Sequence, residues 1–596
     1  MTSQTRLQSL IWPEPGFSTE HDLYVRLSAG AALSIEAPRI DFTPGARADF
    51  GTYYNLFNSG KWHIHCGLET LCLALEGVGR FELTVFYAHP DRPRERVVQD
   101  VVALDGVHIF DVAPPNGFDP RGVLFFEITA QGEGHLNGAH WQTDAAPRRT
   151  PDLMVSVTTF QREAAVARTA ERFARFARTS PIAEHLHLTI VDNGQSADIP
   201  PAPNVTVIAN ANLGGSGGFA RGLLAAQDRR ATHCLFMDDD AAVHMEAIER
   251  TWTFLAYATD SGTAVAGAVA TVRGSWELWE NGALFHQVCR PLFNGTDLRD
   301  LTETLAMEFA STARAPDNFY GGWWYFAFPV DGVRHMPFPF FVRGDDVSFS
   351  LVHDFVPVTL PGVMSLQDED FSVKETPLTV YLDLRSHLAH HLSLPQMEIG
   401  RMGLLKIILR FHLRSLILCH YDTLDAVVLA LGDVRAGPGY FADNADLAAR
   451  RRDIAAGTDM ERWRSVAQAS DTQDRLHLPS HWRGPRFLMK CTLNGHLLPG
   501  FGLIGNRITL PAARRGAIRP VWGAARITYH SVDGTRSYTV AHSKRRAWAA
   551  TCNMLGHAWA IWRDYGALRD RWREGYQDKT RVSFWKTALG LENTDG

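Results

Sequence analysis

The stretch that decides the fold reads Cys234-Leu-Phe-Met-Asp-Asp-Asp240. Its apolar half predicts a short buried strand, which delivers three consecutive carboxylates to its C-terminal end. Three adjacent like charges repel, so a compensating cation is expected beside them, and hard oxygen ligands suit Mg²⁺ or Mn²⁺. Open α/β sheets bind ligands beyond the carboxyl ends of their strands. We therefore expect a metal site that holds the diphosphate of a nucleotide, although a solvated acidic loop or a helix N-cap would explain the same triplet.

The residues around this strand alternate between strand and helix patterns. Short apolar runs predict buried strands, and the segments between them have the spacing of helices. Strands that alternate with helices are typical of a parallel α/β sheet. The strands are expected at 153–158, 186–191 and 205–208, and the helices at 169–178 and 223–229.

Two further zones flank this α/β region. Before about residue 150, short runs such as 68–75 and 80–87 are separated by Gly, Pro, Asp and Asn, which favours an antiparallel β-sandwich. Beyond about residue 395, long helical patterns dominate, including 443–466 and 544–574. We therefore expect three domains, at residues 1–150, 151–395 and 396–596.

Three aromatic residues of the first zone, Tyr53, Tyr54 and Trp62, admit two interpretations. Exposed aromatic rings bind sugar rings, whereas aromatic residues inside a sandwich belong to its core. The core is the more frequent case, and we expect it here.

Composition excludes several classes of protein. A chain of 596 residues is too long for one core, and its 45% hydrophobic and 21% charged residues are ordinary for a globular protein. The net charge of -6 gives no basic field for nucleic acid. Seven scattered cysteines suggest reduced thiols in a cytoplasmic protein without a signal peptide. Lys406, Arg410 and Arg414 interrupt the apolar run 404–418, which fits an amphipathic helix that faces the core or lies on a membrane surface.

A glycine-rich motif, Asn212-Leu-Gly-Gly-Ser-Gly-Gly218, follows the third expected strand and opens a helix. Glycines let a backbone approach a ligand closely and expose N–H groups at a helix N-terminus. The motif is neither a Walker A sequence nor the dinucleotide fingerprint of a first strand. A structural turn is the alternative, but the position one strand before the Asp triplet favours a functional role.

Polar residues also follow the first two expected strands. Thr158, Thr159 and Arg162 come after the first strand, and Asp192 and Asn193 come after the second. Such side chains bind a base or ribose, although Asp-Asn-Gly is also an ordinary turn. Because parallel strands end at one edge of a sheet, we expect all these loops on the same edge.

A second acidic pair, Asp345 and Asp346, follows the apolar run Pro339-Phe-Phe-Val-Arg343. A carboxylate that does not ligate a metal serves as a general base on a hydroxyl, and the same residues also fit a helix N-cap. Upstream, Trp323 and Trp324 follow two glycines. Tryptophan pairs usually pack in cores, but beside an acidic base they suit a platform for an acceptor sugar.

In this order, the motifs resemble an inverting GT-A glycosyltransferase of family 2, and within it the bacterial galactofuranosyltransferases that polymerise cell-wall galactan. The resemblance rests on the glycine motif, the Asp triplet, Gly322-Trp-Trp324 and Phe340-Phe-Val-Arg-Gly-Asp-Asp346, and it covers nearly the whole chain. It implies an α/β fold: a Rossmann-like mixed sheet between an N-terminal antiparallel β-sandwich and a C-terminal helical region.

The resemblance also implies roles for individual residues. Asp346 would be the catalytic base, with Asp345 beside it at the acceptor and Trp323 and Trp324 shaping the acceptor site. Mn²⁺ or Mg²⁺ would be held on the diphosphate of UDP by Asp238 and Asp240. The donor nucleotide would be lined by Thr159, Arg162, Asp192, Asn193, Asn212, Gly214, Gly215 and Asp238.

Two positions depart from the family pattern. Gln367 stands where the family has a histidine metal ligand, and a neutral amide is a weaker donor than imidazole. Asp368 or Asp370 would substitute after a small shift of the chain. Ser348 stands where the family pattern has a glutamate two residues after the acidic pair.

The donor and acceptor follow from the resemblance alone. UDP-galactofuranose is the expected donor, with dTDP-rhamnose the alternative, and a glycan or lipid-linked oligosaccharide is the expected acceptor. A lipid-linked acceptor would bring the protein to the cytoplasmic face of the membrane through its Arg- and Trp-rich C-terminal helices, which would otherwise form an interface in a homo-oligomer. A nucleotidyltransferase and a non-catalytic glycan-binding protein are the rival hypotheses.

Overall fold

A computed structural model describes residues 4–17, 20–114, 117–367, 375–465, 476 and 483–592, without the side chains of Ala241 and of 483–486. The chain divides into two compact units. Unit 1 consists of residues 1–212, 218–336 and 349–369, and unit 2 of residues 213–217, 337–348 and 370–596. The three expected domain ranges stay predictions.

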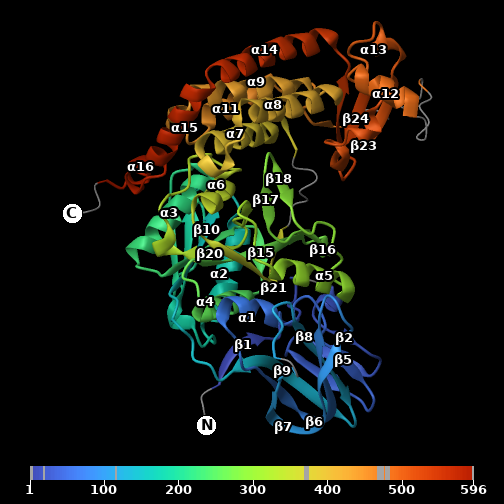
Figure 1. Ribbon diagram of the computed structural model, residues 1–596, viewed down its shortest axis with the longest axis vertical. Coiled ribbons are helices and arrows are strands. Elements are labelled where there is room, and N and C mark those ends of the chain that lie inside the picture. Colours follow the sequence, from blue (N-terminus) through green and yellow to red (C-terminus); the bar gives the residue numbers. More distant parts are fainter. Residues whose placement is uncertain are drawn as a thin grey trace. The chain divides into compact units, whose positions relative to one another are not determined.

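The N-terminal part of unit 1 is one antiparallel sheet of nine strands that curls into a near-barrel (Figure 1). This confirms the antiparallel β-rich zone. Its strands are β1 (Thr5–Ser9), β2 (Arg26–Leu27), β3 (Ala31–Ser34), β4 (Arg39–Phe42), β5 (Arg47–Asp49), β6 (Cys72–Ala88), β7 (Glu95–Asp111), β8 (Val123–Ala130) and β9 (Gly134–Thr143).

Strand β6 differs from the expectation of two separate strands at 68–75 and 80–87. It runs unbroken for 17 residues, pairing with β9 along its first half and with β8 along its second. A side chain at Gly77 would overlap the carbonyl oxygen of His135, so glycine is needed there for close approach of β9 and does not mark a turn. The glycine therefore gave a misleading indication of a break between two strands.

The aromatic residues Tyr53, Tyr54 and Trp62 are buried, as expected for core residues. The Trp62 ring stacks on Phe57, and the Tyr54 ring stacks on Tyr24. None of the three offers a ring face to a sugar.

The second sheet of unit 1 confirms the mixed α/β core. Its strand order is β12-β11-β10-β13-β20-β15-β21-β14, and the four strands β10 to β13 are parallel, with the helices between them at its faces (Figure 1). The bounds are β10 (Leu153–Thr159), α2 (Glu163–Ala177), β11 (Leu186–Asp192), β12 (Val205–Ala209), α3 (Gly214–Asp228), β13 (His233–Asp238), β14 (Ala241–Val243), α4 (Met245–Tyr257), β15 (Thr263–Thr271), β16 (Gly274–Glu280), α5 (Leu301–Thr312), β20 (Phe326–Pro329), α6 (Asp345–Val352) and β21 (Val356–Gln367).

The pairing register of the parallel strands places their polar C-terminal residues side by side. Thr158 of β10 lies opposite Asp238 of β13, and Thr159 of β10 lies opposite Asp192 of β11. The strands themselves are mostly apolar and mostly buried, as expected of parallel strands covered on both faces. The predicted common edge is therefore confirmed for β10, β11 and β13.

Unit 2 contains the C-terminal helical region, as expected, together with a small sheet of order β22-β25-β24-β23 that the sequence did not indicate. Its strands are β22 (Arg464–Ser465), β23 (Asn506–Pro511), β24 (Ala524–His530) and β25 (Arg536–Ala541). Helix α8 buries Leu404, Ile407 and Ile408, so its apolar run faces the core. Among the helices of the described ranges, none has both the length and the apolarity needed to cross a bilayer. The main helices are α7 (Pro377–Ser393), α8 (Gly400–Ile417), α9 (Tyr421–Ala436), α11 (Ala448–Gly457), α14 (Lys544–Arg563) and α15 (Tyr565–Lys579).

Two expected helices are shorter than predicted. The pattern at 443–466 yields α11, preceded by the last residue of α10 (Pro438–Asp443) and followed by strand β22, and Val466 lies outside the described residues. The pattern at 544–574 is divided at Asp564, which separates α14 from α15. Periodicity did not reveal this break, because apolar residues continue on both sides of it.

Candidate functional site

The Asp triplet lies at the carboxyl end of β13, beside the end of β10. Thr159 Oγ1 donates a 2.8 Å hydrogen bond to Asp239 Oδ2. Arg162 Nη1 lies 2.5 Å from Asp240 Oδ2, and its Nε lies 3.9 Å from Asp239 Oδ1. The cation that accompanies the triplet in this structure is therefore the guanidinium of Arg162. Burial raises the pKa of Asp239, while the bond from Thr159 and the charge of Arg162 lower it.

Gln367 joins the triplet from a distant part of the chain. It is the last residue of β21, it is buried, and its Nε2 donates to Asp238 Oδ2 over 3.3 Å. Sequence reasoning assigned this residue to the metal site, and the structure places it next to one of the two proposed carboxylate ligands.

The donor set fits a hard divalent cation. Asp238 and Asp240 supply carboxylate oxygens and Gln367 an amide group, which are ligand types of Mg²⁺ and Mn²⁺. The described residues contain no group of three or more His, Cys, Asp and Glu that suits a metal. Asp368 and Asp370, the alternative ligands, lie outside the described residues.

The polar side chains at the end of β11 and just after it are occupied by hydrogen bonds within the protein. Asp192 accepts bonds from the backbone N–H groups of Gly194, Ser196 and Ala197, at 2.9, 2.7 and 2.7 Å. Asn193 Oδ1 accepts a 2.8 Å bond from the side chain of Asn210. Both residues are buried, so they shape the loop that would border a nucleotide, and direct contact with one stays a prediction.

In unit 2, the glycine motif forms the first turn of α3. Gly214 has a φ of 69°, and a side chain there would overlap the carbonyl oxygen of Phe341, so close packing requires this glycine. A Cβ at Gly215 would have Asp345 Oδ2 as its nearest neighbour, at 3.5 Å. Gly215 is thus the glycine of this turn with room beside it, and it faces a carboxylate. Asn212, just before this turn, is the last residue of the first segment of unit 1.

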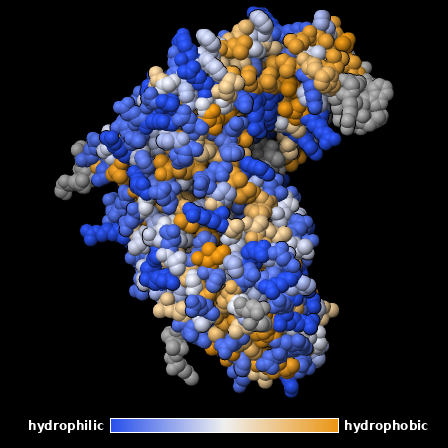
Figure 2. Space-filling view, in the orientation of Figure 1, coloured by the Kyte–Doolittle hydropathy of each residue, from blue (hydrophilic) through white to orange (hydrophobic). Residues whose placement is uncertain are grey.

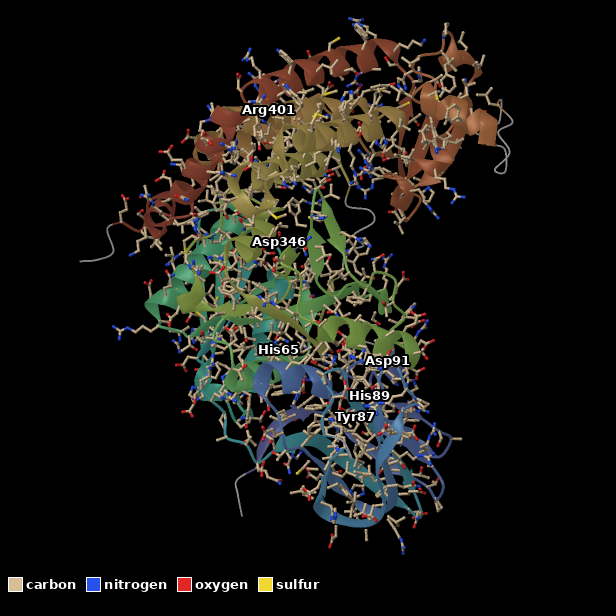
Figure 3. The ribbon with its side chains drawn as sticks, in the orientation of Figure 1. His65, Tyr87, His89, Asp91, Asp346 and Arg401 are labelled. Carbon is tan, nitrogen blue, oxygen red and sulfur yellow. The ribbon has the colours of Figure 1, made fainter. Side chains whose placement is uncertain are left out.

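The acidic pair begins α6, and its first turn lies in unit 2 (Figure 3 labels Asp346). Ser216 Oγ donates a 3.0 Å bond to Asp345 Oδ2, and Asp346 Oδ1 accepts a 2.8 Å bond from its neighbour Val347 N. Burial raises the pKa of both carboxyls, and the charge of Asp346 raises that of Asp345 further. A raised pKa near a helix N-terminus suits a group that accepts and releases a proton.

Ser216 is the site residue that sequence reasoning missed. It lies inside the glycine motif, but the motif was read for its glycines only. The signal in the sequence that could have revealed it is the hydroxyl-bearing residue four positions after Asn212. Ser348, the second departure from the family pattern, is buried, and its Oγ donates to the carbonyl oxygen of Asp345.

The tryptophan pair divides between core and surface in unit 1. The Trp323 ring is buried against Phe219, Phe236 and Phe349, with centroids 4.9, 5.0 and 5.7 Å away. Trp324 is partly exposed and donates its Nε1–H to the carbonyl oxygen of Gly267. A platform for an acceptor sugar stays a prediction, and Trp324 is the better placed of the two.

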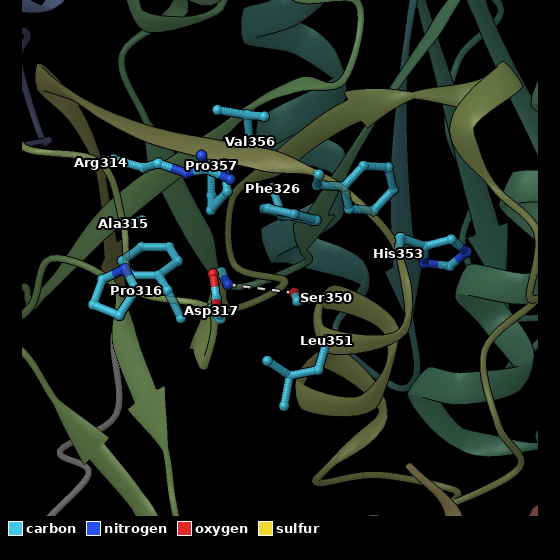
Figure 4. A pocket seen from close by; sticks show the side chains of 13 residues that line it. Arg314, Ala315, Pro316, Asp317, Phe326, Ser350, Leu351, His353, Val356 and Pro357 are labelled. Carbon is cyan, nitrogen blue, oxygen red and sulfur yellow. Dashed lines mark hydrogen bonds between the residues drawn. The ribbon is translucent and has the colours of Figure 1, made fainter. Parts of the chain in front are cut away.

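A small cavity of about 70 Å³ lies elsewhere in unit 1 (Figure 4). Its walls combine Phe326 and Phe355 with the polar side chains of Arg314, Asp317 and His353. None of the predicted site residues lines it.

Comparisons with known proteins relate one part of the chain to a family. Residues 7–144 match the family model described as Galactofuranosyltransferase 2 N-terminal. No curated protein matches the chain. Among solved structures, "Crystal Structure of a Mycobacterial Protein" is 13% identical, with 41% of this chain and 75% of that chain covered and a TM-score of 0.25. The Clostridium thermocellum xylanase 10B CBM22-1–GH10 structure is 10% identical, with 28% and 34% covered and a TM-score of 0.13.

Proposed function

We propose that this chain is an inverting glycosyltransferase that moves galactofuranose from UDP-galactofuranose onto a glycan or lipid-linked acceptor in cell-envelope polysaccharide synthesis. The match of residues 7–144 to a galactofuranosyltransferase domain supports transfer of a sugar. The observation that carries the proposal is the convergence of Thr159 and Arg162 on the Asp triplet, at the carboxyl ends of the parallel strands of the central sheet. That edge is where α/β folds bind nucleotides.

The donor side of the reaction is assigned to residues of unit 1. Asp238 and Asp240, with Gln367, would hold Mn²⁺ or Mg²⁺, which when bound neutralises charge on the leaving diphosphate. Arg162 supplies a guanidinium of the kind that binds phosphate oxygens in pairs. Asp192 and Asn193 fix the loop that borders the nucleotide through their buried hydrogen bonds.

The acceptor side is assigned to the acidic pair. Asp346 takes a proton from an acceptor hydroxyl, and that oxygen attacks the anomeric carbon of the donor sugar. The bond from the anomeric carbon to UDP breaks in the same step, so the configuration inverts. Asp345, held by Ser216, positions the acceptor. Its raised pKa and that of Asp346 favour a proton acceptor that works near neutral pH.

Calorimetric titration with UDP tests the donor site. We expect binding that strengthens with Mn²⁺ and that Asp240→Asn weakens by about ten-fold or more, since a charged carboxylate ligand becomes a neutral amide. The matched control is Asp297→Asn, a carboxylate of the same unit that pairs with Arg299 outside the proposed site. Preference for dTDP over UDP would favour the rhamnosyl donor, and no binding of either nucleotide would leave the non-catalytic glycan-binding hypothesis ahead.

A further inference from the structure

Helix α14 presents apolar side chains to solvent along one face. Trp548, Leu555 and Trp559 have exposed fractions of 74%, 51% and 64%. At about 100° per residue, these positions fall within about 40° of one another around the helix axis. They therefore form one stripe about 16 Å long at a rise of 1.5 Å per residue.

The opposite face of α14 already has its packing partners. Ala547, Ala550, Met554, Ala558 and Ile561 are buried, and Ala547 and Ala550 belong to the core cluster that includes residues of α9 and the small sheet. The exposed stripe is thus not needed to hold the helix in unit 2. Three large apolar residues in water, two of them tryptophan, are costly unless something covers them.

Further apolar side chains lie where α14 begins. Leu503 and Ile504 of α13 (Phe501–Ile504) are exposed, and the ring of Phe501 lies 5.2 Å from that of His542, two residues before α14. Apolar surface gathers over this part of unit 2 (Figure 2). Phe487 and Leu488, in the helix before α13, and Leu497, between the two helices, are exposed as well.

The charge of α14 has one sign. The helix contains Lys544, Arg545, Arg546 and Arg563 and no aspartate or glutamate. Arg546 pairs with Asp422 and Asp425, and Arg563 pairs with Asp564. Lys544 and Arg545 then add positive charge at the end of the helix where the α13 residues lie.

We propose that this surface, the stripe of α14 with the exposed residues of α12 (Arg483–Cys491) and α13, binds the interface of an anionic lipid bilayer. Tryptophan is enriched at the headgroup level of membranes because its ring is apolar and its N–H is polar. Helices with such a stripe lie in the plane of the interface, and each Lys or Arg near an anionic leaflet adds to binding. A second copy of the chain fits less well, since two such faces would bring like charges together.

Vesicle co-sedimentation of the full-length protein tests the proposal. We expect binding to vesicles of phosphatidylcholine with phosphatidylglycerol and much weaker binding to phosphatidylcholine alone. Leu555→Glu should reduce the partition coefficient by roughly ten-fold or more, because it places a carboxylate in the stripe. Val107→Glu on β7 is the matched control, an exposed aliphatic residue in unit 1 whose replacement should leave partition unchanged.

A second variant keeps the test independent of folding. Lys544→Gln with Arg545→Gln leaves the apolar stripe intact and should remove most of the preference for anionic lipid. Equal sedimentation of the wild type and Leu555→Glu would overturn the proposal. So would a wild-type oligomer in light scattering that Leu555→Glu dissociates, since the covering partner would then be a second copy.

Discussion

Arg162 Nη1 lies 2.5 Å from Asp240 Oδ2, so the arginine pairs with a carboxylate that is also proposed to hold a divalent cation. The carboxylate is largely buried, whereas the arginine side chain is about one-third exposed. Guanidinium and metal ion would then compete for the same oxygen atoms. A diphosphate that binds the guanidinium would relieve this competition.

We therefore predict opposite effects of Arg162→Gln on the two ligands. Mn²⁺ should bind the nucleotide-free protein several-fold more tightly, because the competing charge is gone. UDP should bind about ten-fold more weakly, because a charge-assisted contact is lost. Calorimetry with each ligand measures both, with Arg175→Gln on the exposed face of α2 as the control. Unchanged affinity for Mn²⁺ would show that the ion pair and the metal site are separate.

Replacing Gln367 with histidine should strengthen metal binding. Imidazole is a stronger donor than a neutral amide, so we expect Gln367→His to raise the affinity for Mn²⁺ by about ten-fold. Gln367→Ala, which removes the side chain beside Asp238, should lower it. Spectroscopic titration of Mn²⁺ distinguishes the three proteins, and equal affinities would remove Gln367 from the site.

Removal of the proposed base should separate catalysis from binding. Asp346→Asn should reduce sugar transfer by roughly 10²–10⁴-fold, the usual contribution of general base catalysis, while UDP affinity changes little. Product formation from UDP-galactofuranose and calorimetry with UDP measure the two quantities. A comparable loss of UDP affinity would instead assign Asp346 to the nucleotide site or to the fold.

The acidic pair should also make stability depend on pH. Burial, with the charge of Asp346 second, raises the pKa of Asp345, so the folded protein binds its proton more tightly than the unfolded chain does. The free energy of unfolding should therefore fall as pH rises from the ordinary Asp pKa near 4 towards neutrality. Asp345→Asn removes this cost and should be more stable than the wild type at about pH 8. Urea unfolding of the wild type and of Asp345→Asn at about pH 5 and about pH 8 measures the difference in their free energies of unfolding. A larger stabilisation by Asp345→Asn at about pH 5 than at about pH 8 would contradict the predicted direction.

A buried ion pair joins α1 (Ser59–Cys66) to α5. Lys61 Nζ lies 2.8 Å from Glu308 Oε2, and both side chains are essentially inaccessible. Lys61→Met should destabilise the protein by roughly 3–5 kcal/mol, because Glu308 would remain buried without its cation. Replacing Glu308 with Gln in the same protein should recover much of the loss. Chemical unfolding of the single and double variants measures both, and additive losses would show that the pair is not coupled.

The strands of the central sheet were predictable because each is a continuous apolar run. The expected strand at 153–158 is β10, and that at 186–191 is β11, each within one residue of its observed end. The common edge followed from the rule that parallel strands end together. In contrast, β6 was divided in two, because Gly77 marks a close crossing of strands and local sequence does not distinguish that from a turn.

The pairings within the site were not predictable. The sequence predicted that Arg162 and the Asp triplet lie at the same edge of the sheet. It did not predict the ion pair between Arg162 and Asp240, because that pair depends on how the loop after β10 turns. The same holds for Ser216 and Asp345, which are 129 positions apart and meet only in the folded chain. Motif reading finds residue types, whereas partners are set by tertiary structure.

Helix α3 passes close to β10 at Gly222, and this limits how the sequence can change over evolutionary time. A side chain at Gly222 would overlap Ser156 Oγ, so helix and strand approach each other over the width of a missing methyl group. A residue with a side chain fits at position 222 only if Ser156 is shortened or moves, whereas shortening Ser156 requires no change at Gly222. In descendants of this protein, position 222 should therefore gain a side chain only after position 156 has lost its own.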